Sequence, residues 1–118
     1  MKNSYKANTI VLIKYSFTDS SDFKVRPALV ICDQLDEDLT CLPISSSHKT
    51  SSLDFELQTL DAVNFSFPIK SFVRLTKLST LSHLLVVKKL GSLKKETFEK
   101  IKKMTINFLS GSHSLNSK

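Results

Sequence analysis

The chain has 118 residues, and 41% of them are apolar, which is enough to form the core of one domain. Its 17 basic residues outnumber its 11 acidic residues, so a net charge of +6 argues against basic partners and favours acidic ones. The sequence lacks both a run of about 18 apolar residues and the apolar start of a signal peptide, so we expect a cytoplasmic protein without contact to membrane.

The first half of the chain predicts three strands. The first covers residues 9–17 and is rich in β-branched side chains, and the second covers residues 25–32 and is nearly all apolar. The third covers residues 39–45 and ends in a serine run. Pro27 cannot donate to a ladder, so we expect it near a strand start or at an edge, where it also keeps Arg26 extended.

The second half is predicted to add strands and one helix. Residues 53–57 alternate strictly between apolar and acidic side chains, which indicates a half-exposed strand. Another strand is expected within residues 67–78. Residues 80–90 fit a short helical turn, a strand, or both in succession.

A helix is predicted over residues 95–109, with Gly111 as a left-handed C-terminal cap and Lys94 in place of the usual N-terminal cap. Residues 1–110 are expected to form a single domain, followed by a disordered tail over 111–118. The apolar face of the helix is assigned to Phe98, Ile101, Thr105, Phe108 and Leu109.

Two cysteines, Cys32 and Cys41, fall on the second and third predicted strands. In a reducing compartment such residues are core thiols more often than a disulfide. They lack metal-ligand spacing and have no accompanying histidine cluster, so no metal site is predicted.

Positive charge is concentrated in one window, since no acidic residue lies between Asp61 and Glu96. Such a window attracts nucleic acid or an acidic protein segment, although a solvated lysine-rich face is the alternative. Its basic residues are Lys70, Arg74, Lys77, Lys88, Lys89, Lys94 and Lys95.

All but two of the 17 basic residues are lysines, and the exceptions are Arg26 and Arg74. The planar guanidinium fork suits a phosphate, whereas lysine is a point charge. From the residues alone, phosphate binding by Arg26 and pairing with a surface carboxylate are equally good readings. For Ser45, a strand-end hydroxyl that satisfies the loop backbone is the alternative to a functional role.

Seven short segments, in this order and spacing, resemble the MazF/PemK toxin family. The resemblance extends from about Ala7 to about Leu109. Where the family has glycine-aspartate, this chain has Ala7-Asn8, and it also departs from the family at Ser47 and Ser82-His83. The matching segments are Ala7–Ile13, Tyr15–Asp19, Arg26–Val30, Cys41–Ser46, Lys70–Arg74, Lys77–Leu81 and Lys88–Leu93.

The resemblance implies an α+β fold, mainly antiparallel β: a small SH3-like barrel with a C-terminal helix. It implies a homodimeric toxin of a type II toxin–antitoxin pair, inhibited by an acidic antitoxin. The implied activity is sequence-specific cleavage of single-stranded mRNA without metal or cofactor, leaving 2′,3′-cyclic phosphate and 5′-hydroxyl ends. Arg26 and Ser45 match the family's catalytic positions.

RNA contacts are predicted around this pair. Single-stranded bases stack on aromatic rings, and lysine or arginine holds the backbone, while Phe17 could equally belong to the core. The predicted RNA-binding residues are Phe17, Lys24, Ser46, Ser47, His48, Lys70, Arg74 and Lys77.

Two other functions stay open at this stage. A related toxin with the same fold poisons DNA gyrase by binding rather than cutting. A nucleic-acid-binding module that has lost activity would bind RNA in a salt-sensitive manner without cleaving it.

Overall fold

The computed structural model describes residues 5–16, 23–33, 36–46 and 52–111. As predicted, these residues form a mainly antiparallel sheet with one C-terminal helix. The elements in chain order are β1 (Thr9–Ser16), β2 (Phe23–Cys32), β3 (Asp38–Ser45), β4 (Asp54–Leu57), β5 (Ala62–Val63), β6 (Ser71–Arg74), β7 (Ser79–Ser82), β8 (Val86–Leu93) and α1 (Lys95–Ser110).

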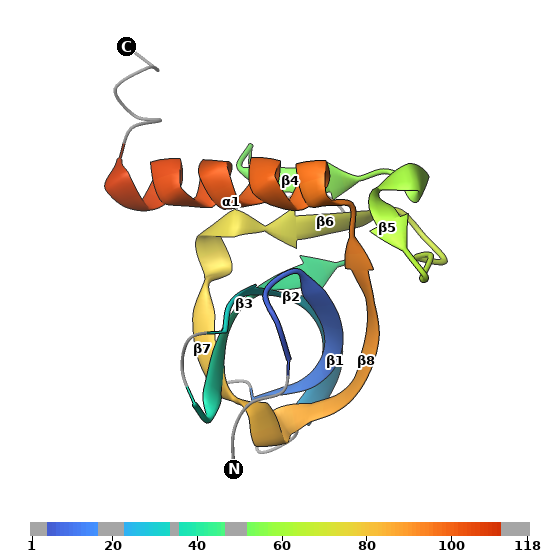
Figure 1. Ribbon diagram of the computed structural model, residues 1–118, viewed down its shortest axis with the longest axis vertical. Coiled ribbons are helices and arrows are strands. Elements are labelled where there is room, and N and C mark those ends of the chain that lie inside the picture. Colours follow the sequence, from blue (N-terminus) through green and yellow to red (C-terminus); the bar gives the residue numbers. More distant parts are fainter. Residues whose placement is uncertain (1–4, 17–22, 34–35, 47–51, 112–118) are drawn as a thin grey trace.

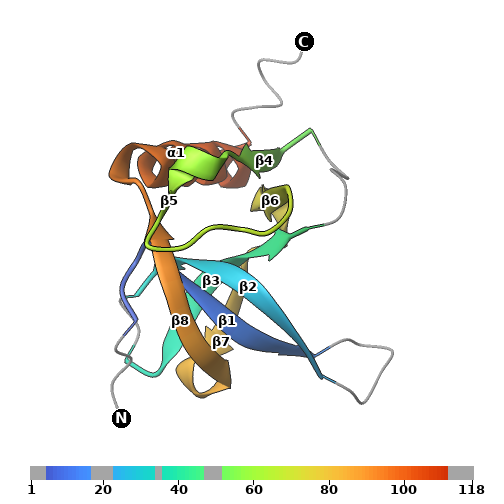
Figure 2. The same cartoon turned by 90° about the vertical axis from the view of Figure 1, so that its right-hand side faces the viewer.

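The sheet has the strand order β4-β6-β3-β2-β1-β8-β5, with β7 also paired to β3. Strand β3 changes partner along its length, because residues 38–41 pair with β7 and residues 44–45 pair with β6. The strands β1, β2, β3, β7 and β8 curve round a common interior, and α1 lies across β4 and β6 at one end (Figure 1, Figure 2).

Side chains alternate between two apolar clusters on opposite faces of β1, β2 and β3, as strand geometry requires. The barrel cluster fills the interior enclosed by the curved strands and consists of Val11, Ile13, Ala28, Val30, Leu39 and Cys41. The helix-side cluster packs under α1 and consists of Ile10, Leu29, Leu42, Ile44, Leu57, Val73, Leu75, Leu93, Phe98 and Ile101.

The helix begins where predicted and extends one residue further than expected. Its cap is confirmed, since Gly111 has φ 78° and its amide donates to the carbonyls of Asn107 and Phe108. Lys94 at the N-terminus makes no side-chain capping bond. The assignment of Leu109 to the buried face was wrong: it is 61% exposed, because the last turn of α1 projects beyond β6 (Figure 1).

Most strand predictions were confirmed within a few residues, including the option of a turn and strands in succession over residues 80–90, but two details differ. Strand β2 begins two residues before the predicted start, and the short β5 was not predicted. The ambiguous region 80–90 contains both options, since a 3-10 turn over His83–Leu85 separates β7 from β8.

Asn8 is one of the residues at which the chain differs from the family it resembles. Its φ of 75° lies in the left-handed region, which asparagine tolerates better than most residues. Its Nδ2 donates to the carbonyl of Leu93 at 2.7 Å, and its Oδ1 accepts from the Leu93 amide at 3.1 Å. The asparagine therefore joins the start of β1 to the end of β8.

Both cysteines are free thiols, as predicted. Cys41 belongs to the barrel cluster, and burial raises the pKa of its thiol to about 12. No group of three or more potential metal-binding side chains occurs among the described residues. In the described part of the chain, no helix is long and apolar enough to cross a membrane.

Gly91 lets the segment after β5 pack directly on β8. A Cβ atom built at this position would lie 2.7 Å from the Val63 carbonyl oxygen and 2.8 Å from the Phe65 Cβ. Both distances are shorter than real Cβ contacts, and neither neighbour is the end of a flexible side chain. Any residue other than glycine would push this segment away from β8.

We therefore expect Gly91→Ala to lower the free energy of unfolding by about 1–3 kcal/mol, the usual cost of overpacking. Urea unfolding followed by circular dichroism measures this change. Gly111→Ala is the control for a conformational penalty, of about 1 kcal/mol, because Gly111 has a left-handed φ. Wild-type stability in Gly91→Ala would contradict the close approach.

Candidate functional site

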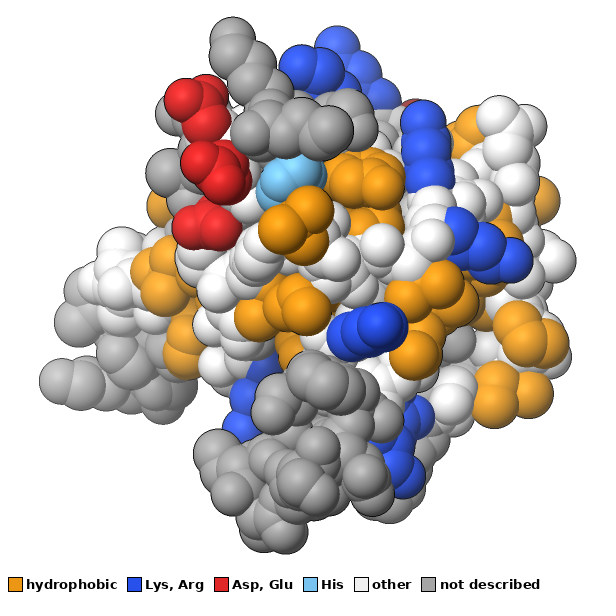
Figure 3. Space-filling model, turned by 90° about the horizontal axis from the view of Figure 1, so that it is seen from below, with side chains coloured by type: hydrophobic (Ala, Val, Ile, Leu, Met, Phe, Trp, Pro, Cys, Tyr) orange, Lys and Arg blue, Asp and Glu red, His pale blue; other side chains and the backbone are white. Residues whose placement is uncertain are grey.

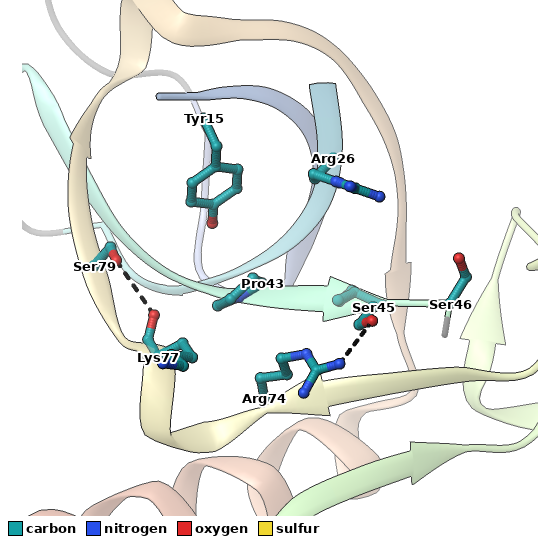
Figure 4. Close-up of a pocket in the computed structure, with 9 residues that line it drawn as sticks. Tyr15, Arg26, Pro43, Ser45, Ser46, Arg74, Lys77 and Ser79 are labelled. Atoms are coloured by element: carbon teal, nitrogen blue, oxygen red, sulfur yellow. Dashed lines mark hydrogen bonds between the residues drawn. The ribbon is translucent and has the colours of Figure 1, made fainter. Parts of the chain in front are cut away.

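A hollow of about 510 Å³ opens at one end of the barrel, beside the last residue of β3. Figure 4 shows its labelled side chains, which come from β1, β2, the end of β3, β6, β7 and the turn between β6 and β7. The lining residues are Tyr15, Arg26, Pro43, Ile44, Ser45, Ser46, Arg74, Lys77 and Ser79. Three of these carry a positive charge and none is acidic, so the hollow favours an anion.

Register explains why Arg26 and Ser45 line the same hollow. The β2–β3 ladder ends at the pair Ala28–Pro43, and Arg26 and Ser45 each lie two residues beyond that pair. In an antiparallel pair, residues two steps along face the same side as the pair itself. Arg26 and Ser45 therefore lie on the barrel-cluster face of the sheet.

Arg26 is exposed and pairs with Ile13 of β1, in a part of β2 that β3 does not cover. Pro27 sits in the same uncovered part, so the expected edge position is confirmed locally. Pro27 pairs with Leu12 of β1 on one side, and β3 does not pair with β2 at this residue. The proline also holds the Arg26 backbone extended.

Ser45 is bound by a second arginine. Arg74 Nη2 donates to Ser45 Oγ at 2.9 Å, and Arg74 Nη1 donates to Asp54 Oδ2 at 3.2 Å. The register places Asp54 opposite Arg74 on neighbouring strands, and Ser45 opposite Phe72. The two hydrogen bonds fix the guanidinium between a carboxylate and the serine hydroxyl, with the fork aimed at the hollow's edge (Figure 4).

The alternation of residues 53–57 predicts a half-exposed strand with its apolar side chains buried, but Asp54 is buried as well. Its side chain is 1% exposed, because it pairs with Arg74, whose side chain is 16% exposed. Burying a charge is costly unless an opposite charge satisfies it. Asp54 is thus a site residue that the sequence pattern concealed.

The positive charge of the basic window is also partly balanced by acidic residues from another part of the chain. Asp54 and Glu56, both on β4 and outside the window, pair with Arg74 and Lys70 respectively. The Lys70–Glu56 pair is 3.5 Å long and exposed, so it contributes little stability. Lys70 does not line the hollow.

The remaining predicted contact residues divide into three groups. Ser46 and Lys77 line the hollow together with Arg74. Lys24 lies directly opposite Tyr15 in the β1–β2 ladder and is exposed, so it extends the basic surface along the same face as Arg26. The predicted contacts at Phe17, Ser47 and His48 lie outside the described residues.

Tyr15 lines the hollow although the sequence analysis did not select it. Its hydroxyl is buried and has no hydrogen-bond partner among the described residues. Burial, and to a lesser extent the neighbouring Cys41, raises the pKa of this phenol, so it stays protonated at neutral pH. Its place at the end of β1, beside a polar loop, gave no signal of this position.

We expect Tyr15→Phe to leave the free energy of unfolding unchanged or to increase it by about 1 kcal/mol, since the change removes an unsatisfied buried polar atom. Thermal unfolding checks this. A loss of more than about 1 kcal/mol would mean that the hydroxyl has a hydrogen-bond partner after all.

Asp54→Ala is expected to lower the free energy of unfolding by about 2–3 kcal/mol, because the change leaves a largely buried guanidinium without its carboxylate. Urea unfolding midpoints measure the effect. Glu56→Ala is a matched control on the same strand and should change stability by less than about 1 kcal/mol. Equal losses in the two variants would show that the Asp54–Arg74 pair contributes no more to the free energy of unfolding than the exposed Lys70–Glu56 pair.

Solved structures with the same fold include three mycobacterial proteins. An endoribonuclease from a mycobacterial species has a TM-score of 0.68 at 12% identity, covering 94% of this chain and 95% of that one. The Mycobacterium tuberculosis toxin MazF-mt6 has a TM-score of 0.62 at 16% identity, covering 84% and 92%. An endoribonuclease in complex with its cognate antitoxin has a TM-score of 0.68 at 11% identity, covering 92% and 96%.

Sequence comparison gives the family directly. No curated protein matches the chain. A family model described as a PemK-like, MazF-like toxin of a type II toxin–antitoxin system matches residues 6–109, nearly the whole chain. The chain belongs to this PemK/MazF-like toxin family.

Proposed function

We propose that this chain is a sequence-specific endoribonuclease that cleaves single-stranded mRNA without a metal ion and thereby arrests translation and growth. The observation that carries the proposal is the hollow in which Arg26 and Ser45 lie together with Arg74 and Lys77. These residues combine a hydroxyl with three positive charges. A phosphodiester that passes through a doubly charged, pentacoordinate state is stabilised by such a set of donors.

In the proposed reaction, the 2′-hydroxyl of one nucleotide attacks the adjacent phosphorus. The bond to the 5′-oxygen of the next nucleotide breaks, which leaves a 2′,3′-cyclic phosphate and a 5′-hydroxyl. The 2′-hydroxyl loses its proton to water as it attacks, and the leaving 5′-oxygen takes up a proton from water. Arg26 donates hydrogen bonds to the non-bridging oxygens and to the leaving oxygen, and Ser45 holds the scissile phosphate by a hydrogen bond. The guanidinium stays charged throughout and so stabilises the developing negative charge.

Arg74 adds a positioning role to this scheme. Its hydrogen bond to Ser45 Oγ fixes the serine rotamer and polarises the hydroxyl toward donation to a phosphate oxygen. Its own position depends on Asp54, which accepts from the other end of the same fork. The chain from Asp54 through Arg74 to Ser45 thus orients the hydroxyl before RNA arrives.

Partners follow from the same surface. Exposed lysines add positive charge on β2 and β8, at Lys24, Lys88 and Lys89. Figure 3 shows Lys and Arg side chains spread over the face of the molecule opposite α1. An acidic antitoxin segment that folds across this surface would compete with RNA for it. A homodimer is proposed as the acting form, as the resemblance to the family implies.

The proposal predicts that Arg26→Ala and Ser45→Ala each reduce RNA cleavage by roughly 100-fold or more, the usual cost of removing one donor to a developing charge. The assay incubates a long RNA of known sequence with the purified protein in EDTA and maps the fragment ends. Discrete cuts with cyclic-phosphate and 5′-hydroxyl ends are expected from the wild type alone.

Lys102→Ala, which removes an exposed charge on α1, is the control and should cut at the wild-type rate. Thermal unfolding of each variant separates loss of chemistry from loss of fold. A double variant, Arg26→Ala with Ser45→Ala, that still cuts would refute the assignment. Intact RNA with the wild type would favour gyrase poisoning or an inactive nucleic-acid-binding module instead.

A further inference from the structure

A second hollow, of about 360 Å³, lies against the opposite face of β1, β2 and β3. It shares Arg26, Ile44 and Ser46 with the first hollow. Leu12 and Pro27 line it, and strand alternation places both on the helix-side-cluster face, away from Ser45. Arg26 therefore stands at the point where a polar hollow and an apolar hollow meet.

Two phenylalanines form the outer wall of this second hollow. Phe65 and Phe67 pack edge to face, with ring centroids 4.7 Å apart and an angle of 88° between the ring planes. Both belong to the segment that follows β5. This segment begins with Asn64, which has a left-handed φ of 59°, and it lies against Gly91 of β8. The left-handed residue and the missing Cβ together hold the aromatic wall near β8.

The rim of the second hollow is basic on two sides. Arg26 lies on one side and Lys88 of β8 on the other, and both are exposed. Ser46 and Ser71 add hydroxyl groups, and no acidic residue lines the hollow. An apolar, aromatic floor between two cations matches a flat base attached to a charged backbone.

We propose that this second hollow binds the nucleobase next to the cleaved phosphate. The role rests on the proposed endoribonuclease function, in which Arg26 holds that phosphate. The nucleotide next to the cleaved phosphate would cross the end of β2 that does not pair with β3. Its base would then stack in the region of Phe65 and Phe67. Lys88 would contact the following phosphate, so the hollow contributes to the sequence selectivity of the cut.

Continuity with the phosphate site favours a base over other occupants. An apolar antitoxin side chain or a second copy of this chain would bury the apolar floor equally well. For a base, the sharing of Arg26 between the two hollows follows directly, because Arg26 holds the cleaved phosphate in the proposed function. The base is the one ligand whose own phosphate must lie at Arg26.

The test uses the double variant Phe65→Leu/Phe67→Leu, which keeps apolar bulk but removes both π faces. Phe55→Leu is the matched control, since Phe55 is also partly buried against the helix-side cluster but lines neither hollow. Thermal unfolding first establishes that both variants fold. Cut sites are then mapped on a long RNA for all three proteins.

Binding is measured next, on short RNAs that carry the wild-type cut site with a 2′-O-methyl group that blocks attack. Each base around the cut is replaced in turn by an abasic residue, and fluorescence anisotropy gives Kd. For the wild type and Phe55→Leu, loss of one base adjacent to the cleaved phosphate should weaken binding about tenfold. For the double variant the same loss should change Kd by less than about twofold, and cutting should become less selective at that base.

Three results would overturn the base-binding role. One is a double variant as sensitive as the wild type to every abasic position. Another is equal sensitivity at all positions in the wild type. The third is unchanged RNA selectivity combined with weaker antitoxin inhibition or an altered oligomeric state, which would assign the hollow to a protein partner.

Failure of the proposed function gives a different result. A wild-type protein that cuts no RNA at the mapping step contradicts the endoribonuclease function, and the base-binding role falls with it. Normal cutting without dependence on the phenylalanines contradicts the base-binding role alone.

Discussion

The arrangement of the site depends on the change of partner along β3. Its first half pairs with β7 and its last two residues pair with β6, while β2 leaves it after Pro43. A strand that ends between two neighbours presents its last side chain to both. Ser45 can therefore face Arg26 from β2 and accept a hydrogen bond from Arg74 of β6. The site therefore forms because the β2–β3 ladder ends at the pair Ala28–Pro43.

The pair Asp54–Arg74 costs desolvation that a pair of apolar residues would not incur. Its position explains why an ion pair suits this place. A buried guanidinium with one amino group bound by a carboxylate keeps its other group fixed for Ser45. An apolar substitute could fill the same space but could not orient a hydroxyl. The ion pair therefore keeps the geometry of the site, although apolar residues at the same two positions would cost less desolvation.

The sequence predicted the regular part of this fold because that part follows local rules. β-branched runs marked β1, and the helical spacing of Phe98 and Ile101 marked the buried face of α1. Asp54 was missed because its partner lies 20 residues away, and alternation carries no information about such a partner. Leu109 was misplaced because periodicity continues past the point where the sheet beneath the helix ends.

Arg26 lines hollows on both faces of the sheet. Neighbouring residues in a strand point to opposite faces, so a side chain normally belongs to one of them. Where β3 no longer covers β2, a long exposed side chain is not confined in this way, and Arg26 borders both hollows. A ligand held by this arginine is then directed across the end of the sheet rather than along a strand. In the proposed function, the phosphate and the base of a nucleotide held by Arg26 would lie on opposite faces of the sheet, so one arginine would set the orientation of the nucleotide.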